Sequence, residues 1–345
     1  MSGANASTAT ATIAIGSPPQ KIALAAFGEH DAHDKTRNFP GAPGGNTPEP
    51  TPQLYVGRFA PSPTGKLHLG SLVAAVGSYA DARRHGGRWL VRMEDLDRPR
   101  VIRGAADEIL RTLETFGLQW DGRVEYQSER TEHYRQALEA LTALGVTFEC
   151  SCSRRERDGE GGYPGTCRAG PTRSGPTATR FRVEDIVVSV EDRLQGRCDF
   201  RLRERGDVIV RRRDGAFAYQ LAVVVDDALQ GVTDVVRGAD LLDSTPWQIA
   251  LQQALKLPTP RYGHVPLVTE PGGEKLAKSR RSVAMEARTA GRQIYEALRL
   301  LRQDPPAELE SESAPSIVHW ACAHWRPERL HAVREVRVGA NRTTV

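Results

Sequence analysis

The chain has 345 residues, of which 39% are hydrophobic and 26% charged, so it is long enough to bury one large core or two ordinary ones. Its formal charge of +4 suits a nucleic-acid partner, although many enzymes that bind no nucleic acid carry a similar charge. Its apolar runs are far shorter than the roughly 18 residues that cross a bilayer, and its mean hydropathy is negative. These properties predict a soluble globular protein with no membrane span.

Residues 1–52 are rich in Ala, Thr, Ser, Gly and Pro and show no periodic apolar face, which predicts a disordered low-complexity extension. Their apolar stretches are too short, and lack the basic start, for a secretory signal. Without such a signal, the five cysteines are expected to be reduced thiols or metal ligands, and the expected compartment is the cytoplasm.

Regular structure is expected from Leu54 onward. A strand is predicted over 54–60, and after a Pro/Gly loop the apolar spacing from Leu67 to Tyr79 predicts a helix. A second strand is expected over 89–93, followed by amphipathic helices near 102–116 and 130–144. This alternation of strands and helices predicts a parallel α/β sheet, so residues 53–149 are interpreted as the first half of a Rossmann-like domain.

The composition changes again after residue 149. Residues 150–178 are rich in Gly, Pro, Ser and Arg and hold three of the five cysteines, which indicates an insertion. The second half of the domain is expected over 179–288. Its predicted elements are strands at Val187 and over 208–210, 218–225 and 234–237, a helix over 247–255 and a strand over 264–268. A short helical C-terminal segment is expected over 289–345.

Two pieces of sequence cross from the first strand into the first helix. They are Gly57-Arg58-Phe59-Ala60-Pro61-Ser62-Pro63-Thr64-Gly65 and Leu67-His68-Leu69-Gly70-Ser71. Free N–H groups and the positive end of the helix dipole favour an anion here, and Gly70 lets a flat ring approach the backbone. Either piece alone is also consistent with a Pro/Gly turn followed by a capping histidine.

Taken together, the two pieces resemble the HIGH-motif region of class I aminoacyl-tRNA synthetases, and the first resembles the glutamate and glutamine branch of that class. Four further matches follow in order: Val91-Arg92-Met93-Glu94-Asp95-Leu96-Asp97-Arg98, Tyr219-Gln220-Leu221-Ala222, Val235-Val236-Arg237-Gly238-Ala239-Asp240-Leu241-Leu242, and Lys275-Leu276-Ala277-Lys278-Ser279. The resemblance departs from the family pattern at Ser71 and at Leu276-Ala277, and neither departure removes a charge that the reaction needs.

The resemblance implies a class I catalytic domain that activates L-glutamate with ATP and Mg²⁺. It places His68 and Lys278 as catalytic residues, and His68, Gly70, Lys275 and Lys278 as ATP-binding residues. Attack of a substrate carboxylate on the α-phosphorus of ATP needs no protein nucleophile. Catalysis is therefore expected to consist of positioning and of neutralising charge on the phosphate oxygens.

A glutamate pocket needs a cation for the side-chain carboxylate, an anion for the ammonium group and polar groups for the rest. By resemblance, the residues that line it are Arg58, Phe59, Ala60, Pro61, Ser62, Glu94, Tyr219 and Arg237. The guanidinium fork of Arg58 can pair with a carboxylate through two hydrogen bonds, which disfavours glutamine because glutamine brings no matching charge.

A possible metal site lies in the Gly-rich insertion. Thiolates at the spacing of Cys150, Cys152 and Cys167 suit tetrahedral zinc, and the spacing alone leaves the fourth ligand open between Tyr163 and an unidentified side chain. Short glutamyl-queuosine tRNA(Asp) synthetases carry a Cys-x-Cys, Tyr, Cys zinc cluster here, so the resemblance implies one structural zinc on Cys150, Cys152, Tyr163 and Cys167. Cys198 and Cys322 stand alone and are expected to be structural.

The acceptor of glutamate follows from the resemblance as well. Only 66 residues follow Ser279, which is too few for the helical portion with which a full glutamyl-tRNA synthetase reads the anticodon. The sequence therefore resembles most closely the glutamyl-queuosine tRNA(Asp) synthetases, which implies glutamate activation without tRNA and transfer to queuosine in the anticodon stem-loop of tRNA(Asp). The arginine-rich segment from Arg201 to Arg213 suits contact with such a loop.

Two alternatives stay open. One is a truncated synthetase that charges the 3′ end of tRNA(Glu), and the other is a non-catalytic, zinc-containing paralogue that binds RNA. The paralogue is disfavoured because the residues expected to bind glutamate and ATP are all present.

Overall fold

A computed structural model describes residues 54–153, 156, 162–270 and 289–338. They all belong to one unit, Glu49–Val345. The predicted disordered extension (1–52) and the segment with Lys275 and Lys278 lie outside the described residues. Within the described residues, no helix has the length and apolar character needed to span a membrane.

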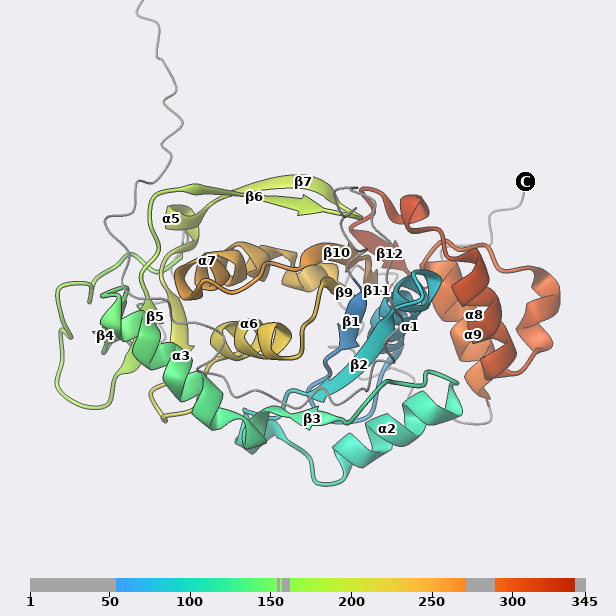
Figure 1. Ribbon diagram of the computed structural model, residues 1–345, viewed down its shortest axis with the longest axis horizontal. Coiled ribbons are helices and arrows are strands. Elements are labelled where there is room, and N and C mark those ends of the chain that lie inside the picture. Colours follow the sequence, from blue (N-terminus) through green and yellow to red (C-terminus); the bar gives the residue numbers. More distant parts are fainter. Residues whose placement is uncertain (1–53, 154–155, 157–161, 271–288, 339–345) are drawn as a thin grey trace, which may run out of the picture. The chain divides into compact units, whose positions relative to one another are not determined.

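The centre of the fold is built from parallel strands. β1 (Val56–Phe59), β2 (Arg88–Met93) and β3 (Glu125–Tyr126) pair in that order. β9 (Asp234–Gly238) and β10 (Arg261–Val265) form a second parallel pair. The backbone N–H of Thr233 donates to the carbonyl of Val56 at 2.9 Å, so β9 begins beside β1 (Figure 1). The predicted parallel sheet is confirmed.

Helices pack on both faces of these strands, because neighbouring strand residues point to opposite sides. Val56 and Leu90 belong to one apolar core, whereas Trp89 and Val91 belong to the other. The core of Trp89 takes in α1 (Leu69–Arg84), α2 (Ala105–Thr115), α8 (Ala290–Leu300) and α9 (Ala314–His324). The core of Leu90 takes in α3 (Thr131–Ala143), α6 (Tyr219–Leu229) and α7 (Thr245–Leu255) (Figure 1).

One predicted strand is wrong. Residues 219–225 lie in the helix α6, which Ala218 precedes as N-cap, and the run Leu221–Val225 is buried throughout because α6 packs among α3, α7 and β8 (Val208–Arg211). A helix that is apolar on every side shows no helical periodicity, and its Val content favours a strand prediction.

The expected strand over 264–268 is two strands, β10 and β11 (Leu267–Thr269), with Pro266 between them. β11 pairs in parallel with β12 (Glu335–Arg337), so the C-terminal segment contributes a strand as well as helices. No sequence pattern indicated β12, because this strand is only three residues long.

The remaining strands are antiparallel. β4 (Thr147–Cys150), β5 (Ala178–Phe181) and β8 form one sheet, and the cysteine-rich insertion connects β4 to β5. β6 (Val187–Asp192) and β7 (Gly196–Arg201) form a hairpin that leads into the short α5 (Leu202–Arg205). Short 3₁₀ turns complete the described chain at Arg98–Arg100, Gln127–Glu129, Ala239–Ser244, Ala307–Ser311 and Pro327–Leu330.

Candidate active site

A cavity of about 620 Å³ lies where β1, β2 and β9 end. The predicted binding residues that line it are Arg58, Phe59, Ala60, Pro61, Ser62, His68, Gly70, Glu94, Tyr219 and Arg237. The carboxyl ends of parallel strands are where open α/β sheets bind ligands. The structure thus brings together residues that lie up to 179 positions apart, Arg58 and Arg237, whereas Lys275 and Lys278 fall outside its described residues.

Other residues line the cavity without having been predicted as ligand contacts: Thr64, Gly65, Lys66, Leu67, Ser71, Ala74, Ile109, Val236, Gly238, Asp240, Leu241, Pro266, Leu267 and Val268. Several of them belong to the motifs that carried the family resemblance, so the motifs could have identified them. Leu267 and Val268 form part of β11, which the sequence did not separate from β10.

His68 caps the first helix at the wall of the cavity. Its Nδ1 accepts a hydrogen bond from the backbone N–H of Ser71 at 3.2 Å, and its backbone carbonyl accepts from Leu72 at 2.9 Å. The Ser71 hydroxyl lies 3.1 Å from Nε2 of the same ring. A Cβ atom on Gly70 would stand 3.2 Å from the imidazole, so glycine leaves room for the ring. The helix N-terminus and this imidazole therefore face the same cavity.

The guanidinium group of Arg58 is held in place by the buried carboxylate of Asp227. Its Nε donates to Oδ1 of Asp227 in α6 at 3.3 Å, and both side chains are buried. The same oxygen lies 2.8 Å from Nη2 of Arg92, which is fully buried. Burial raises the pKa of Asp227, but the two guanidinium groups outweigh that effect and hold the pKa below its usual range. Asp227 is therefore an anion that fixes Arg58 at the cavity wall.

Glu94 is one of two acidic residues in the cavity wall, and Asp240 is the other. Its Oε1 lies 3.6 Å from Nη2 of Arg92. Burial raises the pKa of Glu94 to about 7, because Arg92 and Arg58 offset the loss of hydration only in part. A cation bound beside Glu94 would favour its charged form.

Asp226, next to Asp227, lies beneath the cavity and joins α6 to the α3 region. Its carboxylate accepts hydrogen bonds from Arg130 Nε at 2.7 Å, from Gln127 Nε2 at 2.8 Å and from Tyr134 Oη at 2.7 Å. Buried carboxylates are stable only when they are paired and hydrogen-bonded. This network fixes the position of the helix that carries both Tyr219 and Asp227.

Arg237 and Tyr219 are in direct contact in the wall of the cavity. Nη1 of Arg237 donates to the Tyr219 hydroxyl at 3.3 Å, and its Nη2 donates to Thr245 Oγ1 at 2.9 Å. Its Nε donates to Nε2 of His264 at 3.0 Å. No sequence motif pointed to Thr245 or His264, because their role depends on contacts across neighbouring elements.

The predicted zinc ligands also come together. The sulfur atoms of Cys150, Cys152 and Cys167 are buried and lie within 4.8 Å of one another. Cys152 and Cys167 are 3.4 Å apart, and the Tyr163 hydroxyl lies 3.5 Å from Cys150 and 3.7 Å from Cys152. Zinc–sulfur bonds of about 2.3 Å in a tetrahedron place ligand atoms about 3.8 Å apart. The four side chains therefore fit one zinc ion.

The chain around this cluster is held by close packing. Gly206 has φ +70°, and a Cβ atom there would lie 2.3 Å from the backbone nitrogen of Tyr163, so this position requires glycine. Arg213 donates to the carbonyl oxygens of Ser151 and Cys152 at 3.0 and 2.9 Å. Cys198 and Cys322 are free thiols outside the cluster.

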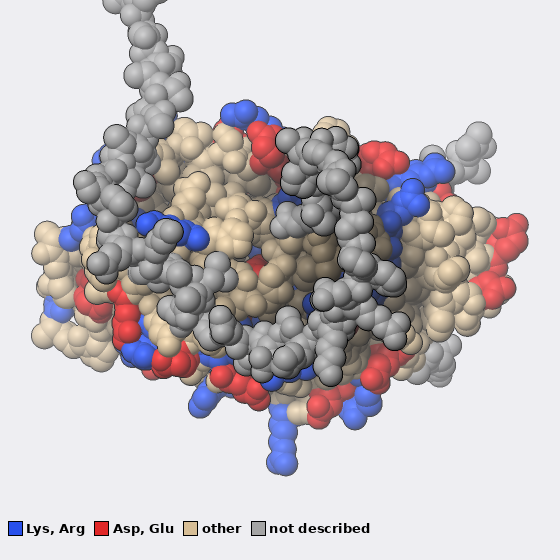
Figure 2. All heavy atoms as spheres, viewed as in Figure 1, with Lys and Arg blue, Asp and Glu red and all other residues tan. Residues whose placement is uncertain are grey.

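The arginine-rich segment is largely paired with acids. Arg201 and Arg203 both reach Asp185, at 3.5 and 3.4 Å, and Arg205 reaches Asp243 at 2.8 Å. On the face seen in Figure 2, basic and acidic side chains are interspersed. The segment is therefore not a uniform basic surface, although exposed ion pairs of this kind contribute little and exchange readily.

A family model described as "tRNA synthetases class I (E and Q), catalytic domain" matches residues 55–160 and 164–302. The glutamyl-Q tRNA(Asp) synthetase of Ectopseudomonas mendocina is 54% identical over 278 residues, which cover 80% of this chain and 95% of that protein. The protein of the same name from Thiobacillus denitrificans is 53% identical over 288 residues, covering 81% and 96%. The chain belongs to the glutamyl-Q tRNA(Asp) synthetase family.

A solved glutamate-tRNA synthetase from Elizabethkingia anophelis has the same fold, with a TM-score of 0.69 and 22% identity over 84% of this chain and 68% of that one. The predicted class I catalytic fold is thus confirmed. So is the assignment to the class I aminoacyl-tRNA synthetase ligases, which use ATP with Mg²⁺.

Proposed function

We propose that the protein activates L-glutamate with ATP in the absence of tRNA and then transfers the glutamyl group to queuosine in the anticodon of tRNA(Asp). One observation carries the first half of this proposal. Lys66 and Asp240 also line the cavity, and the charged residues in its wall that were predicted to contact glutamate are two guanidinium groups, Arg58 and Arg237, and one carboxylate, Glu94. Glutamate has the complementary set of charges, two carboxylates and one ammonium group.

In this proposal Arg58 and Arg237 bind the carboxylates of the substrate, and Glu94 binds its ammonium group. The strand end from Phe59 to Ser62 and the hydroxyl of Tyr219 complete the pocket. Glutamine has the same shape but no side-chain charge, so it leaves a buried guanidinium without its partner. Glutamate is therefore expected to be strongly preferred.

The activation step joins an oxygen of the α-carboxylate of glutamate to the α-phosphorus of ATP, and the bond from that phosphorus to the bridging oxygen breaks as pyrophosphate leaves. We assign His68 and Gly70, at the start of α1, to the binding of ATP, together with Lys275 and Lys278. Mg²⁺ would neutralise the pyrophosphate oxygens. Removing one such contact typically slows a reaction by roughly 10²- to 10³-fold.

The acceptor is inferred from the relatives. Those named glutamyl-Q tRNA(Asp) synthetase match this chain over 93% to 98% of their own length, so the likeness extends to nearly the whole of those proteins. The cyclopentenediol of queuosine resembles a ribose diol, which lets one pocket present an acyl-adenylate to an anticodon loop. Exchangeable ion pairs at Arg201 and Arg203 suit phosphate contacts, because a polyanion can replace Asp185.

We also propose one structural zinc ion, held by Cys150, Cys152, Tyr163 and Cys167 in the insertion over 150–178. Metal binding supplies folding free energy to segments that have little apolar core of their own. Among the described residues, the buried apolar cluster at this insertion consists of the ligands themselves and Phe148 of β4.

Exchange of labelled pyrophosphate into ATP tests the activation step. Exchange is expected with glutamate in the absence of tRNA, and not with glutamine at the same concentration. Exchange that requires tRNA, or that proceeds equally well with glutamine, would contradict the proposed activity.

A further inference from the structure

A buried histidine accepts a hydrogen bond from Arg237. Nε2 of His264 lies 3.0 Å from Nε of Arg237, and the two residues are direct neighbours in the parallel pair of β9 and β10. His264 has no exposed surface and is not part of the cavity wall. A guanidinium group can only donate, so Nε2 of this imidazole must carry no proton.

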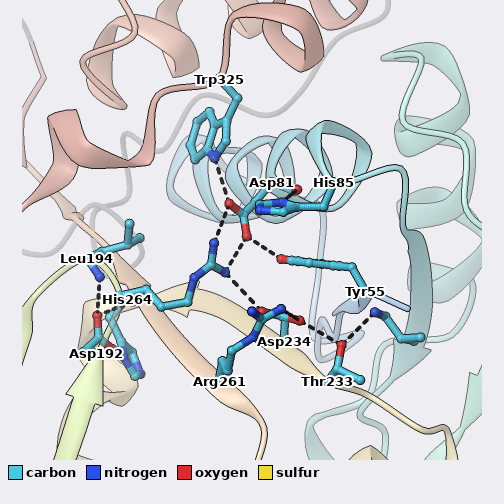
Figure 3. Close-up of polar contacts among 12 residues, drawn as sticks. Tyr55, Asp81, His85, Asp192, Leu194, Thr233, Asp234, Arg261, His264 and Trp325 are labelled. Carbon is cyan, nitrogen blue, oxygen red and sulfur yellow. Dashed lines mark hydrogen bonds and ion pairs between the residues drawn. The ribbon is translucent and has the colours of Figure 1, made fainter. Parts of the chain in front are cut away.

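The other ring nitrogen is fixed by a carboxylate. Nδ1 of His264 lies 2.5 Å from Oδ2 of Asp192, the last residue of β6. Oδ1 of Asp192 accepts from the backbone N–H group of Leu194 at 2.9 Å (Figure 3). It also accepts from the backbone N–H groups of Gln195 and His264 at 2.8 and 3.1 Å. So many donors hold Asp192 as an anion, and the ring proton must then lie on Nδ1.

The surroundings of His264 oppose a second proton. Burial lowers the pKa of His264, and the nearby positive charges of Arg237 and Arg58 lower it further, against the opposing effect of Asp192. The remaining neighbours, the stacked ring of Tyr262 and the hydroxyl of Thr245, carry no charge at neutral pH. The neutral form with its proton on Nδ1 is therefore the one that the geometry requires.

The donors of Arg237 are nearly all used. Nε–H reaches His264, Nη2 reaches Thr245 and the carbonyl of Leu241 at 3.4 Å, and Nη1 reaches Tyr219. A guanidinium has five N–H groups, so the contacts of the described residues leave one N–H of Nη1 for a ligand in the cavity. The direction of this remaining N–H depends on the acceptors that bind the rest of the guanidinium group. His264 is the acceptor for Nε.

We propose that Asp192 and His264 are positioning residues for substrate recognition, which aim Arg237 into the cavity by keeping His264 neutral with its proton on Nδ1. The inference rests on the proposed function, because it takes Arg237 to bind glutamate. Neither residue touches the substrate. Asp192 belongs to the hairpin of β6 and β7, whose tip is bound to β10 and to the C-terminal segment through Gln195, which donates to the carbonyls of His264 and Val333.

Two substitutions at one position separate the two ring nitrogens. His264→Asn places an amide where Nδ1 faces Asp192 and leaves no acceptor for Arg237. His264→Gln can place its carbonyl oxygen where Nε2 stands and so keeps that acceptor. Loss of a hydrogen bond to a charged group typically weakens binding by roughly ten- to hundredfold.

In pyrophosphate exchange, the KM for glutamate should therefore rise at least about tenfold in His264→Asn. His264→Gln should recover most of that loss, and the KM for ATP should change little in either variant. Equal KM values for glutamate in the two variants would overturn the proposal.

The tautomer has a readout that does not depend on activity. The ¹⁵N shifts of the His264 side chain, assigned by their loss in His264→Gln, should show a protonated Nδ1 and an unprotonated Nε2 at neutral pH. In Asp192→Asn this preference should weaken. A proton on Nε2 in the wild-type protein would overturn the proposal, even if glutamate is activated.

Asp81→Asn is the matched control. Asp81 is as buried as Asp192 and accepts hydrogen bonds from Tyr55, Arg193 and Trp325 (Figure 3). This substitution should lower the melting temperature and leave the KM for glutamate unchanged. A rise in that KM as large as in His264→Asn would mean general loosening and would refute positioning. A wild-type protein without glutamate-dependent exchange would instead contradict the proposed function and leave the tautomer measurement intact.

Discussion

Nη2 of Arg92 lies 2.8 Å from Oδ1 of Asp227, and both side chains are buried beneath the cavity. Arg92 also lies 3.7 Å from Asp226 and 3.6 Å from Glu94. One buried cation thus faces three carboxylates, two from α6 and one from the end of β2. The charges of the candidate glutamate pocket depend on a residue that does not line it.

Arg92→Met should destabilise the protein, because it leaves these carboxylates without their shared cation. Breaking a buried ion pair typically costs about 3 to 5 kcal/mol of unfolding free energy. Urea unfolding followed by circular dichroism measures the change. Arg135→Ala, which breaks exposed pairs with Glu132 and Glu139 on α3, is the control and should leave the unfolding midpoint nearly unchanged. A variant of Arg92 as stable as the wild type would contradict the network.

Glu94→Gln should stabilise the unliganded protein at pH 8. The pKa of Glu94 rises from 4.5 to about 7 on folding, so its charged form is disfavoured in the folded state. The free-energy cost of burying this charge in the folded state is complete above about pH 7. It shrinks as the pH falls and is absent below the unfolded pKa of 4.5. It is on the order of 3 kcal/mol. Thermal or urea unfolding of both proteins at pH 4 and pH 8 measures it.

The same substitution should weaken glutamate binding, because the amide no longer pairs with the ammonium group. In the wild-type protein, the KM for glutamate should rise as the pH falls below about 7, where Glu94 takes up a proton. Glu94→Gln should flatten this pH dependence. If Glu94→Gln bound glutamate as tightly as the wild type does, Glu94 would not be the residue that binds the ammonium group.

The zinc site can be tested by metal content. The purified protein should hold about one zinc per chain, and Cys150→Ser combined with Cys167→Ser should remove it. The matched control is Cys198→Ser combined with Cys322→Ser, since neither thiol belongs to the cluster. Zinc that survives the first pair of substitutions, or is lost with the second, would refute the assignment.

Much of the cavity could be predicted from sequence because its residues sit in short motifs at strand ends. Arg58 and Glu94 follow from such motifs, and the structure places both in one cavity. The residues behind them could not be predicted in the same way. Asp192 and His264 are 72 positions apart and carry no local pattern, and only the folded hairpin brings them together.

The wrong strand prediction over 218–225 has the same kind of cause, namely contacts between elements that are distant in the sequence. The run Leu221–Val225 is apolar at every position because α6 is enclosed by neighbouring elements. Local propensity favours a strand there, and the tertiary environment decides for a helix.

Transfer of radiolabelled glutamate to different tRNAs identifies the acceptor. The substrates to compare are queuosine-containing tRNA(Asp), the same tRNA without its 3′-terminal adenosine, unmodified tRNA(Asp) and tRNA(Glu). Both queuosine-containing forms should be labelled equally, and unmodified tRNA(Asp) and tRNA(Glu) should not be labelled. Labelling of unmodified tRNA(Asp) or of tRNA(Glu) would contradict transfer to queuosine and favour charging of a 3′ end. So would a failure to label the queuosine-containing tRNA that lacks its 3′-terminal adenosine.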